Sequence, residues 1–212
     1  MITSVKKLEL IQKHGKKFTD SKSSNLVLQG IHYAENGSVY ANNRHYILRF
    51  RNAHTFTEPF TSHAVTGAKI DEKYPDIEKV FPTSVTTEFV LRNLSSSGDQ
   101  IKNALHYAKW AHDIAKVGDK FKRILLMLES QSVVISVKQE LVEFKAWFAP
   151  YEGSERFTMI LSGEYLLNAL QLFKDAGTIE LRVRMKGKHD PLLLTDEQNE
   201  IDVLICPFRT CD

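Results

Sequence analysis

The chain has 212 residues, of which 42% are hydrophobic and 25% are charged, and its 28 Lys and Arg against 26 Asp and Glu leave a net charge of +2. This composition excludes a mainly disordered chain, because the apolar fraction suffices for a core and the net charge is small. No apolar run approaches the roughly 20 residues that span a bilayer, and the start, Met1 to Lys7, lacks the apolar stretch of a secretory signal. We therefore expect a cytoplasmic protein without a membrane partner.

Basic residues concentrate near the amino terminus, where residues 1–25 hold six lysines against two acidic residues. Leu8 and Ile11 recur there at helical spacing, which predicts an amphipathic helix from Ser4 to about Lys17. Ser4 is the expected N-cap, and Gly15 lies near the end. Two interpretations of the lysines stay open: a solvated helix face, or a face presented to phosphates.

The segments after this helix are typical of strands, at residues 25–33, 39–43 and 45–50. Asn36-Gly37 separates the first two, and this dipeptide between β-prone runs favours a hairpin. The first part of the chain is therefore expected to be a helix followed by a small antiparallel meander.

The same order is expected twice more. Apolar spacing predicts helices over residues 99–117 and 162–176, the second ended by Gly177. The expected strands after them cover 122–129, 131–138, 142–148, 178–185, 190–196 and 201–208. Repeated helix-plus-antiparallel-meander units indicate an α+β fold with the helices on one side of the sheets.

The segment 51–97 contains Pro59, Pro75 and Pro82 and no long helical pattern. We expect it to consist mostly of loop with isolated strands. A boundary in this region gives two expected domains, 1–85 and 86–212.

Several segments, in order along the chain, are similar to one known family. They are Leu28-Gln29-Gly30-Ile31, Asn42-Asn43-Arg44-His45-Tyr46-Ile47, the run from Lys73 to Pro82, Tyr165-Leu166-Leu167-Asn168-Ala169-Leu170, Asp190-Pro191-Leu192-Leu193-Leu194 and Ile205-Cys206-Pro207-Phe208-Arg209. Together they resemble the bacterial DNA polymerase III β subunit, the DNA sliding clamp. The resemblance implies the DNA-clamp fold, with 1–85 equivalent to a shortened middle domain and 86–212 to the last domain.

The sequence also departs from that family. Residues equivalent to its whole first domain are absent, which suggests a shortened relative of a phage or prophage type. Arg44 stands where the family has glycine before histidine, and glycine permits a backbone approach that arginine does not.

The resemblance implies a non-catalytic processivity factor of DNA replication, an accessory subunit of a DNA polymerase that holds duplex DNA through its phosphates. No cofactor, metal or catalytic residue is expected. The expected DNA contacts are exposed cations on the helices: Lys6, Lys7, Lys13, Lys16, Lys17, Lys102 and Lys109.

The resemblance also implies a cleft that docks short peptides from the DNA polymerase and other clamp-binding proteins, and assembly as a homo-oligomer. The residues mapped to this cleft are Asn42, Arg44, His45, Ile47, Pro82, Leu204, Cys206, Pro207 and Phe208. For Ile47 and Leu204, plain core packing is the competing interpretation.

Enzyme motifs are lacking. The eight histidines are scattered, and His106 and His112 do not have the four-residue spacing of a helical zinc site. There is no glycine-rich phosphate loop and no nucleophile elbow. The alternative to a clamp is a clamp-fold interaction protein, or mimic, that modulates a host replication machine without encircling DNA.

Overall fold

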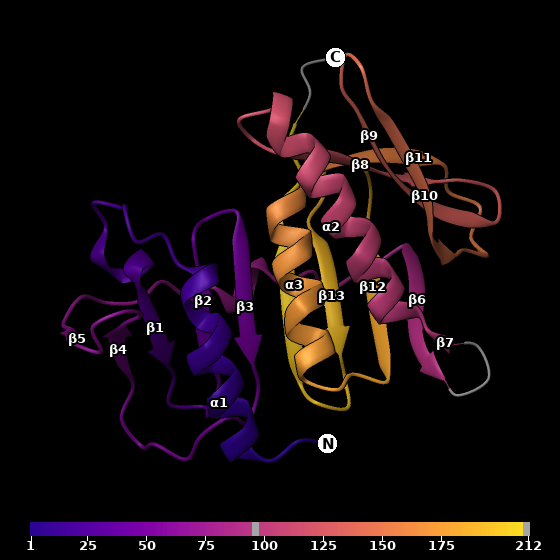
Figure 1. Cartoon of the computed structure of the whole chain (residues 1–212). Helices are drawn as coiled ribbons and strands as arrows, with labels where there is room; N and C mark the ends of the chain where they lie inside the picture. Colours follow the sequence, from indigo (N-terminus) through magenta and orange to yellow (C-terminus); the bar gives the residue numbers. More distant parts are fainter. Residues whose placement is uncertain (95–97, 210–212) are drawn as a thin grey trace. The chain divides into compact units, whose positions relative to one another are not determined.

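The computed structural model describes residues 1–94 and 98–209. These residues form three α-helices, α1 (Ser4–His14), α2 (Gln100–Gly118) and α3 (Gly163–Asp175), which confirms the helices predicted from the spacing of apolar residues (Figure 1). The predicted N-cap of α1 is wrong by one position. Thr3 is the cap, and its hydroxyl accepts a hydrogen bond from the Lys6 backbone N–H at 3.2 Å.

The chain divides into two compact units, and the first is discontinuous in sequence. It comprises Met1–Phe81 together with Thr195–Leu204, whereas the second comprises Pro82–Leu194 and the residues from Ile205 onward. The sequence predicts two continuous domains, divided between residues 85 and 86. It does not predict that a carboxyl-terminal segment, Thr195–Leu204, belongs to the first unit.

The sheet of the first unit has the strand order β5-β4-β1-β2-β3-β14. Its strands are β1 (Gly30–Tyr33), β2 (Val39–Asn42), β3 (Tyr46–Phe50), β4 (Phe60–His63), β5 (Lys69–Ile70) and β14 (Ile201–Ile205). The predicted hairpin joins β1 and β2 antiparallel, with Ile31 opposite Ala41. Gly37 in its turn has a φ of 78°, and a Cβ there would lie 2.9 Å from the His54 carbonyl oxygen.

Short 3-10 helices account for one difference from expectation in this unit. The predicted strand 25–33 begins as a 3-10 helix, η2 (Leu26–Gln29), because the Asn25 side chain caps it by accepting from the Val27 N–H at 3.1 Å. Two further 3-10 helices are η1 (Gly15–Phe18), which continues α1, and η3 (Glu78–Val80). The short strands β4 and β5 lie in the segment that was expected to be mostly loop.

The second unit contains two groups of antiparallel strands, in the orders β13-β12-β6-β7 and β10-β9-β8-β11. The bounds are β6 (Thr87–Leu94), β7 (Gly98–Asp99), β8 (Arg123–Leu128), β9 (Ser132–Lys138), β10 (Glu143–Pro150), β11 (Phe157–Ser162), β12 (Glu180–Met185) and β13 (Leu192–Asp196). Strand β6 was missed as a defined element, although it pairs along its length with β12.

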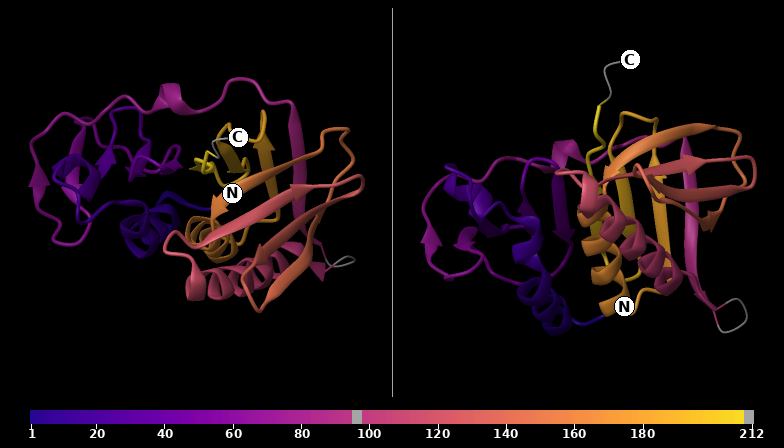
Figure 2. Two further views of the ribbon diagram at one scale, coloured as in Figure 1. Left: turned by 90° about the horizontal axis from the view of Figure 1, so that it is seen from above. Right: turned by 45° about the horizontal axis from the view of Figure 1, so that its top comes forward.

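Helices α2 and α3 lie side by side on one face of the strands of this unit (Figures 1 and 2). Close packing is possible because α2 turns a row of small residues inward: Ala104, Ala108, Ala111 and Ala115, all fully buried. The large apolar side chains of this part of the core come from α3, where Leu166, Leu170 and Phe173 are buried. The predicted α+β arrangement, with helices on one side of the sheets, is confirmed. In the described parts of the chain, no helix is both long and apolar enough to span a membrane.

Candidate nucleic-acid interface

Helix α1 and the 3-10 helix η1 separate apolar from basic side chains. Leu10, Ile11 and Phe18 are buried, whereas Lys16 and Lys17 are exposed on η1. On α1, Lys6 and Lys13 are exposed as well, and the Lys6 ammonium lies 3.1 Å from the Glu9 carboxylate. An exposed ion pair of this kind exchanges readily with other partners, because solvent screens it.

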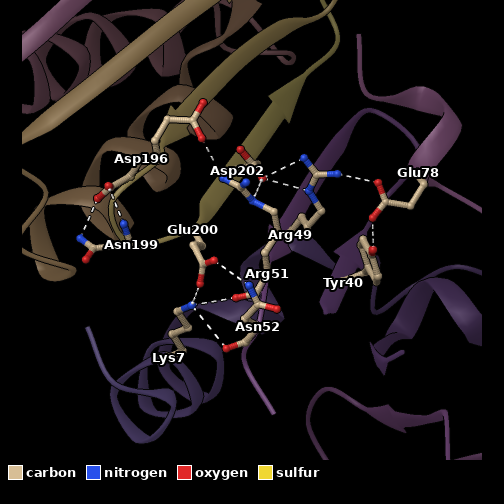
Figure 3. Close-up of polar contacts among 11 residues, drawn as sticks. Lys7, Tyr40, Arg49, Arg51, Asn52, Glu78, Asp196, Asn199, Glu200 and Asp202 are labelled. Carbon is tan, nitrogen blue, oxygen red and sulfur yellow. Dashed lines mark hydrogen bonds and ion pairs between the residues drawn. The ribbon is translucent and has the colours of Figure 1, made fainter. Parts of the chain in front are cut away.

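Lys7 does not belong to this exposed group, so the prediction that it contacts DNA is corrected. Its side chain is only 2% exposed, and its Nζ donates to the Glu200 carboxylate at 2.5 Å and to the Arg51 carbonyl oxygen at 2.7 Å (Figure 3). Helical periodicity explains the difference, since Lys7 lies three residues before the buried Leu10 and four before Ile11, on the inward face.

The partner of Lys7 belongs to a larger network within the first unit. Asn52 donates to the second Glu200 oxygen at 2.6 Å. Burial alone would raise the pKa of Glu200, but the hydrogen bonds from Lys7 and Asn52 and the positive charges nearby lower this pKa below its ordinary value. These contacts attach the segment 195–204 to α1 and to the end of β3.

Asp202 on β14 anchors the other half of the network. This carboxylate is buried and lies 2.9 Å from the Arg49 guanidinium and 3.1 Å from that of Arg51. Arg49 also bonds to Glu78 at 2.6 Å, and Glu78 accepts from the Tyr40 hydroxyl (Figure 3). Arg49 and Arg51 are therefore structural cations of the first unit rather than free phosphate ligands.

Helix α2 carries the other lysines predicted to contact DNA. Its N-cap is Asp99, whose carboxylate accepts from the Lys102 backbone N–H at 2.8 Å. The Lys102 and Lys109 side chains are exposed on the face opposite the alanine row. Lys116, seven residues further, is exposed on the same line and was missed. The seven-residue spacing, which returns a side chain to nearly the same face of a helix, was the signal for it.

Three of the residues mapped to the peptide cleft are buried. Ile47 and Leu204 are 4% and 0% exposed, so each packs in the core, and their mapping to a binding wall is corrected. Asn42 is also buried, and its side-chain amide donates to the Tyr74 hydroxyl at 2.6 Å. A side chain committed to such an internal bond does not reach a peptide.

The other mapped residues retain exposed surface. Arg44 and His45 are exposed in the turn after β2. Arg44 adopts a φ of 77°, the left-handed conformation that favours glycine, which agrees with the glycine expected at this position of the resembled family. Pro82, Cys206, Pro207 and Phe208 are half-buried.

Cys206 has the surroundings of a structural rather than a reactive thiol. Burial raises its pKa, and the positive charge of Arg209 opposes this effect only in part. Among the described residues, no group of three or more His, Cys, Asp or Glu side chains could hold a metal ion.

Comparison with known proteins supports one fold. No protein-family model and no curated protein matches the chain. Solved structures do match: the DNA polymerase sliding clamp from Pseudomonas aeruginosa has 14% identity and a TM-score of 0.79, over 99% of this chain and 66% of that one. The β subunit of the DNA polymerase of Streptococcus pyogenes has 16% identity and a TM-score of 0.81, over 97% and 64%.

A third structure agrees, the DNA polymerase sliding clamp from Bacillus subtilis, with 17% identity and a TM-score of 0.75 over 99% of this chain and 63% of that one. The chain thus spans about two thirds of the length of these clamps. The chain has the fold of the bacterial DNA polymerase III β sliding clamps.

Proposed function

We propose that this chain is a non-catalytic accessory protein of DNA replication, which contacts duplex DNA through its phosphates with exposed lysines on its helices. The observation that carries the proposal is the arrangement of these lysines. Lys16 and Lys17 in the first unit, and Lys102 and Lys109 in the second, all lie on helix faces opposite to the buried side. Long cations on helix surfaces suit contacts that neutralise phosphates without reading bases.

The test is duplex DNA binding as a function of salt. Each phosphate contact contributes about 0.9 to the slope of log affinity against log salt. Reversing four contacting lysines, in Lys16→Glu, Lys17→Glu, Lys102→Glu and Lys109→Glu combined, should lower the magnitude of the slope by about 3.6. The matched control combines reversals at four exposed lysines outside these helices: Lys69, Lys79, Lys138 and Lys186.

The control makes the same change in net charge. It therefore distinguishes DNA binding at the helix lysines from a general electrostatic attraction between DNA and the whole protein. We expect the control protein to keep most of its affinity and slope. Equal losses in both proteins, or no loss in either, would contradict the proposal. No loss of DNA affinity in either protein would favour the alternative, a clamp-fold interaction protein that modulates a replication machine without binding DNA.

Docking of peptides from the polymerase and other clamp-binding proteins is the second part of the proposal. It is supported by half-buried apolar side chains in the second unit, where Phe208 contacts the exposed ring of Phe121 at a centroid distance of 5.9 Å. Phe208→Ala should weaken capture of such a peptide, measured by fluorescence anisotropy. Phe56→Ala, which truncates an exposed aromatic in the first unit, is the control and should have no effect.

A further inference from the structure

The first unit contains an open cleft between the β1–β2 hairpin turn and the loop that follows β3. Its volume is about 660 Å³, within the range of sites that hold a ligand. Three stretches of chain line the cleft: Ser4 at the start of α1, then Glu35, Asn36 and Gly37 in the turn, and Asn52, His54, Thr55, Phe56 and Thr57 in the loop. None of these residues is a proposed DNA contact, so the cleft is a separate site.

Phe56 presents an aromatic ring that is held in place. The residue is 46% exposed, and its ring stacks on that of His54 with 4.7 Å between centroids. His54 is buried, its Nδ1 accepts from the Phe56 backbone N–H at 3.1 Å, and its Nε2 donates to the Ser38 carbonyl oxygen at 3.2 Å. Because both nitrogens of His54 bond within the chain, this neutral ring supports Phe56 and leaves ligand contact to the exposed part of the Phe56 ring.

The lining of the cleft is negative and rich in hydrogen-bond acceptors. Apart from the neutral His54, its one ionisable side chain is Glu35, which is exposed and has no ion-pair partner among the described residues. Asn52 donates its amide N–H to Glu200 at 2.6 Å, which leaves its amide oxygen as an acceptor. A carboxylate, further acceptors and an aromatic ring together suit a cation with several N–H donors.

The first unit already contains one complete example of this combination. The Arg49 guanidinium lies 3.7 Å from the centroid of the Phe81 ring and 2.6 Å from the Glu78 carboxylate, the second contact being drawn in Figure 3. A planar guanidinium can stack on a ring and bond to a carboxylate at once, whereas an ammonium is a point charge. The cleft has the ring of Phe56 and the carboxylate of Glu35, and no basic residue lines it.

We propose that this cleft binds an arginine side chain in an extended segment of a partner protein, with the guanidinium over the Phe56 ring and its N–H groups bonded to Glu35. The cleft is larger than one guanidinium group, which leaves space for the residues that flank the arginine. The positive end of α1 at Ser4 repels a cation, so the guanidinium lies on the side of the hairpin turn. Peptides without arginine should not depend on Phe56, which makes this site distinct from docking at Phe208.

The test is a titration of the full chain with a blocked glycine-arginine-glycine tripeptide, followed by ¹H–¹⁵N NMR. Saturable shifts are expected at the amides of Gly37 and Phe56. Two matched tripeptides replace the arginine with lysine or with citrulline, which keeps the planar end but has no charge. The lysine peptide should bind about threefold more weakly or worse because it does not stack, and the citrulline peptide about tenfold more weakly because it is neutral.

Variants of the cleft locate the binding. Phe56→Leu and Glu35→Gln should each weaken binding of the arginine tripeptide by about threefold or more. Phe56→Tyr keeps the aromatic ring and should bind as the wild type does, which separates a ring contact from damage to the fold. Trp147→Leu and Glu140→Gln remove an exposed aromatic ring and an exposed carboxylate in the second unit; these controls should have no effect.

Equal affinities for the three tripeptides, shifts confined to other parts of the chain, or unchanged binding by Phe56→Leu and Glu35→Gln would overturn the proposal. Free L-arginine supplies the same guanidinium without flanking peptide groups, and we expect it to bind more weakly than the tripeptide. Equal or tighter binding of the free amino acid would assign the cleft to a small molecule and overturn the assignment to a partner segment. DNA affinity is measured with the lysine variants of the helices, which leave the cleft intact, so failure here leaves the proposed function untouched.

Discussion

Lys7 and Lys6 are adjacent in the chain, yet their side chains have different surroundings. Lys6 makes an exposed pair with Glu9, whereas Lys7 is enclosed between α1 and the segment 195–204, with Glu200 as its counter-ion. A buried ammonium is costly to desolvate, so its contribution depends on how completely its partners satisfy it. The Lys7 ammonium has a carboxylate and a main-chain carbonyl within 2.7 Å.

Lys7→Met should therefore lower the free energy of unfolding by about 2 to 4 kcal/mol, because it leaves Glu200 with an unpaired charge in a mostly enclosed site. Lys6→Met, in the same helix, is the control and should change it by less than about 0.5 kcal/mol. Urea denaturation followed by circular dichroism measures both. Equal effects of the two substitutions would show that the burial of Lys7 has no energetic consequence.

The same contact predicts a dependence on pH. The pKa of Glu200 is lower in the folded chain than its ordinary value of 4.5, so the unfolded chain binds more protons in the window below that value, and stability falls as the pH falls. The stabilisation is fully present above pH 4.5 and is lost as the pH drops through the folded pKa. The difference in unfolding free energy between the wild type and Lys7→Met should thus shrink on acidification, as urea titrations at successive pH values would reveal. A constant difference would assign the effect to packing alone.

At the scale of elements, helix α2 has a buried face that packs against α3 and an exposed face that carries lysines. Its row of alanines allows α3 to approach closely, while its opposite face presents Lys102, Lys109 and Lys116. Because the inner side chains are small, little space exists for extra methyl groups at that contact.

Ala108→Leu should therefore destabilise the chain by about 1 to 3 kcal/mol through overpacking. His106→Leu, an exposed position of the same helix, should stay within about 0.5 kcal/mol. Thermal unfolding monitored by circular dichroism compares the two. If Ala108→Leu were neutral, the contact between α2 and α3 would be looser than the structure has it.

Sequence patterns located α1, α2 and α3 because each has a long apolar periodicity and a cap. They failed at η2, where a single Asn25 side chain diverts the backbone, and at β6, whose partner strand β12 lies about 90 residues further along the chain. The exposed lysines of the candidate interface were found from charge and periodicity together. Lys7 was misplaced because its counter-ion, Glu200, lies 193 residues away in the chain.

At the scale of the whole molecule, the first unit depends on a distant piece of chain. Its buried and half-buried cations, Lys7, Arg49 and Arg51, take their carboxylates from Glu200 and Asp202. Strand β14 also completes the sheet beside β3. Residues 1–81 therefore contain the three cations and the edge of β3 that β14 covers. Of the carboxylates named here as their partners, these residues hold only Glu78, the second partner of Arg49.

A fragment of residues 1–81 should consequently fail to fold, because Lys7 and Arg51 would lose their counter-ions, Arg49 would keep only Glu78, and β3 would lose its neighbouring strand. Joining residues 195–204 to its end through a flexible glycine-serine linker should restore a cooperative fold, since the linker converts a distant pairing into a local one. Amide chemical-shift dispersion and near-ultraviolet circular dichroism distinguish the two fragments. The same joined fragment with Asp202→Asn and Glu200→Gln keeps the strand but removes its charges. If it folded as well as the parent fragment, strand pairing alone would hold the unit together. We expect it to be distinctly less stable, because Glu200 and Asp202 pair with Lys7 and Arg51, and Asp202 is one of the two carboxylates that pair with Arg49.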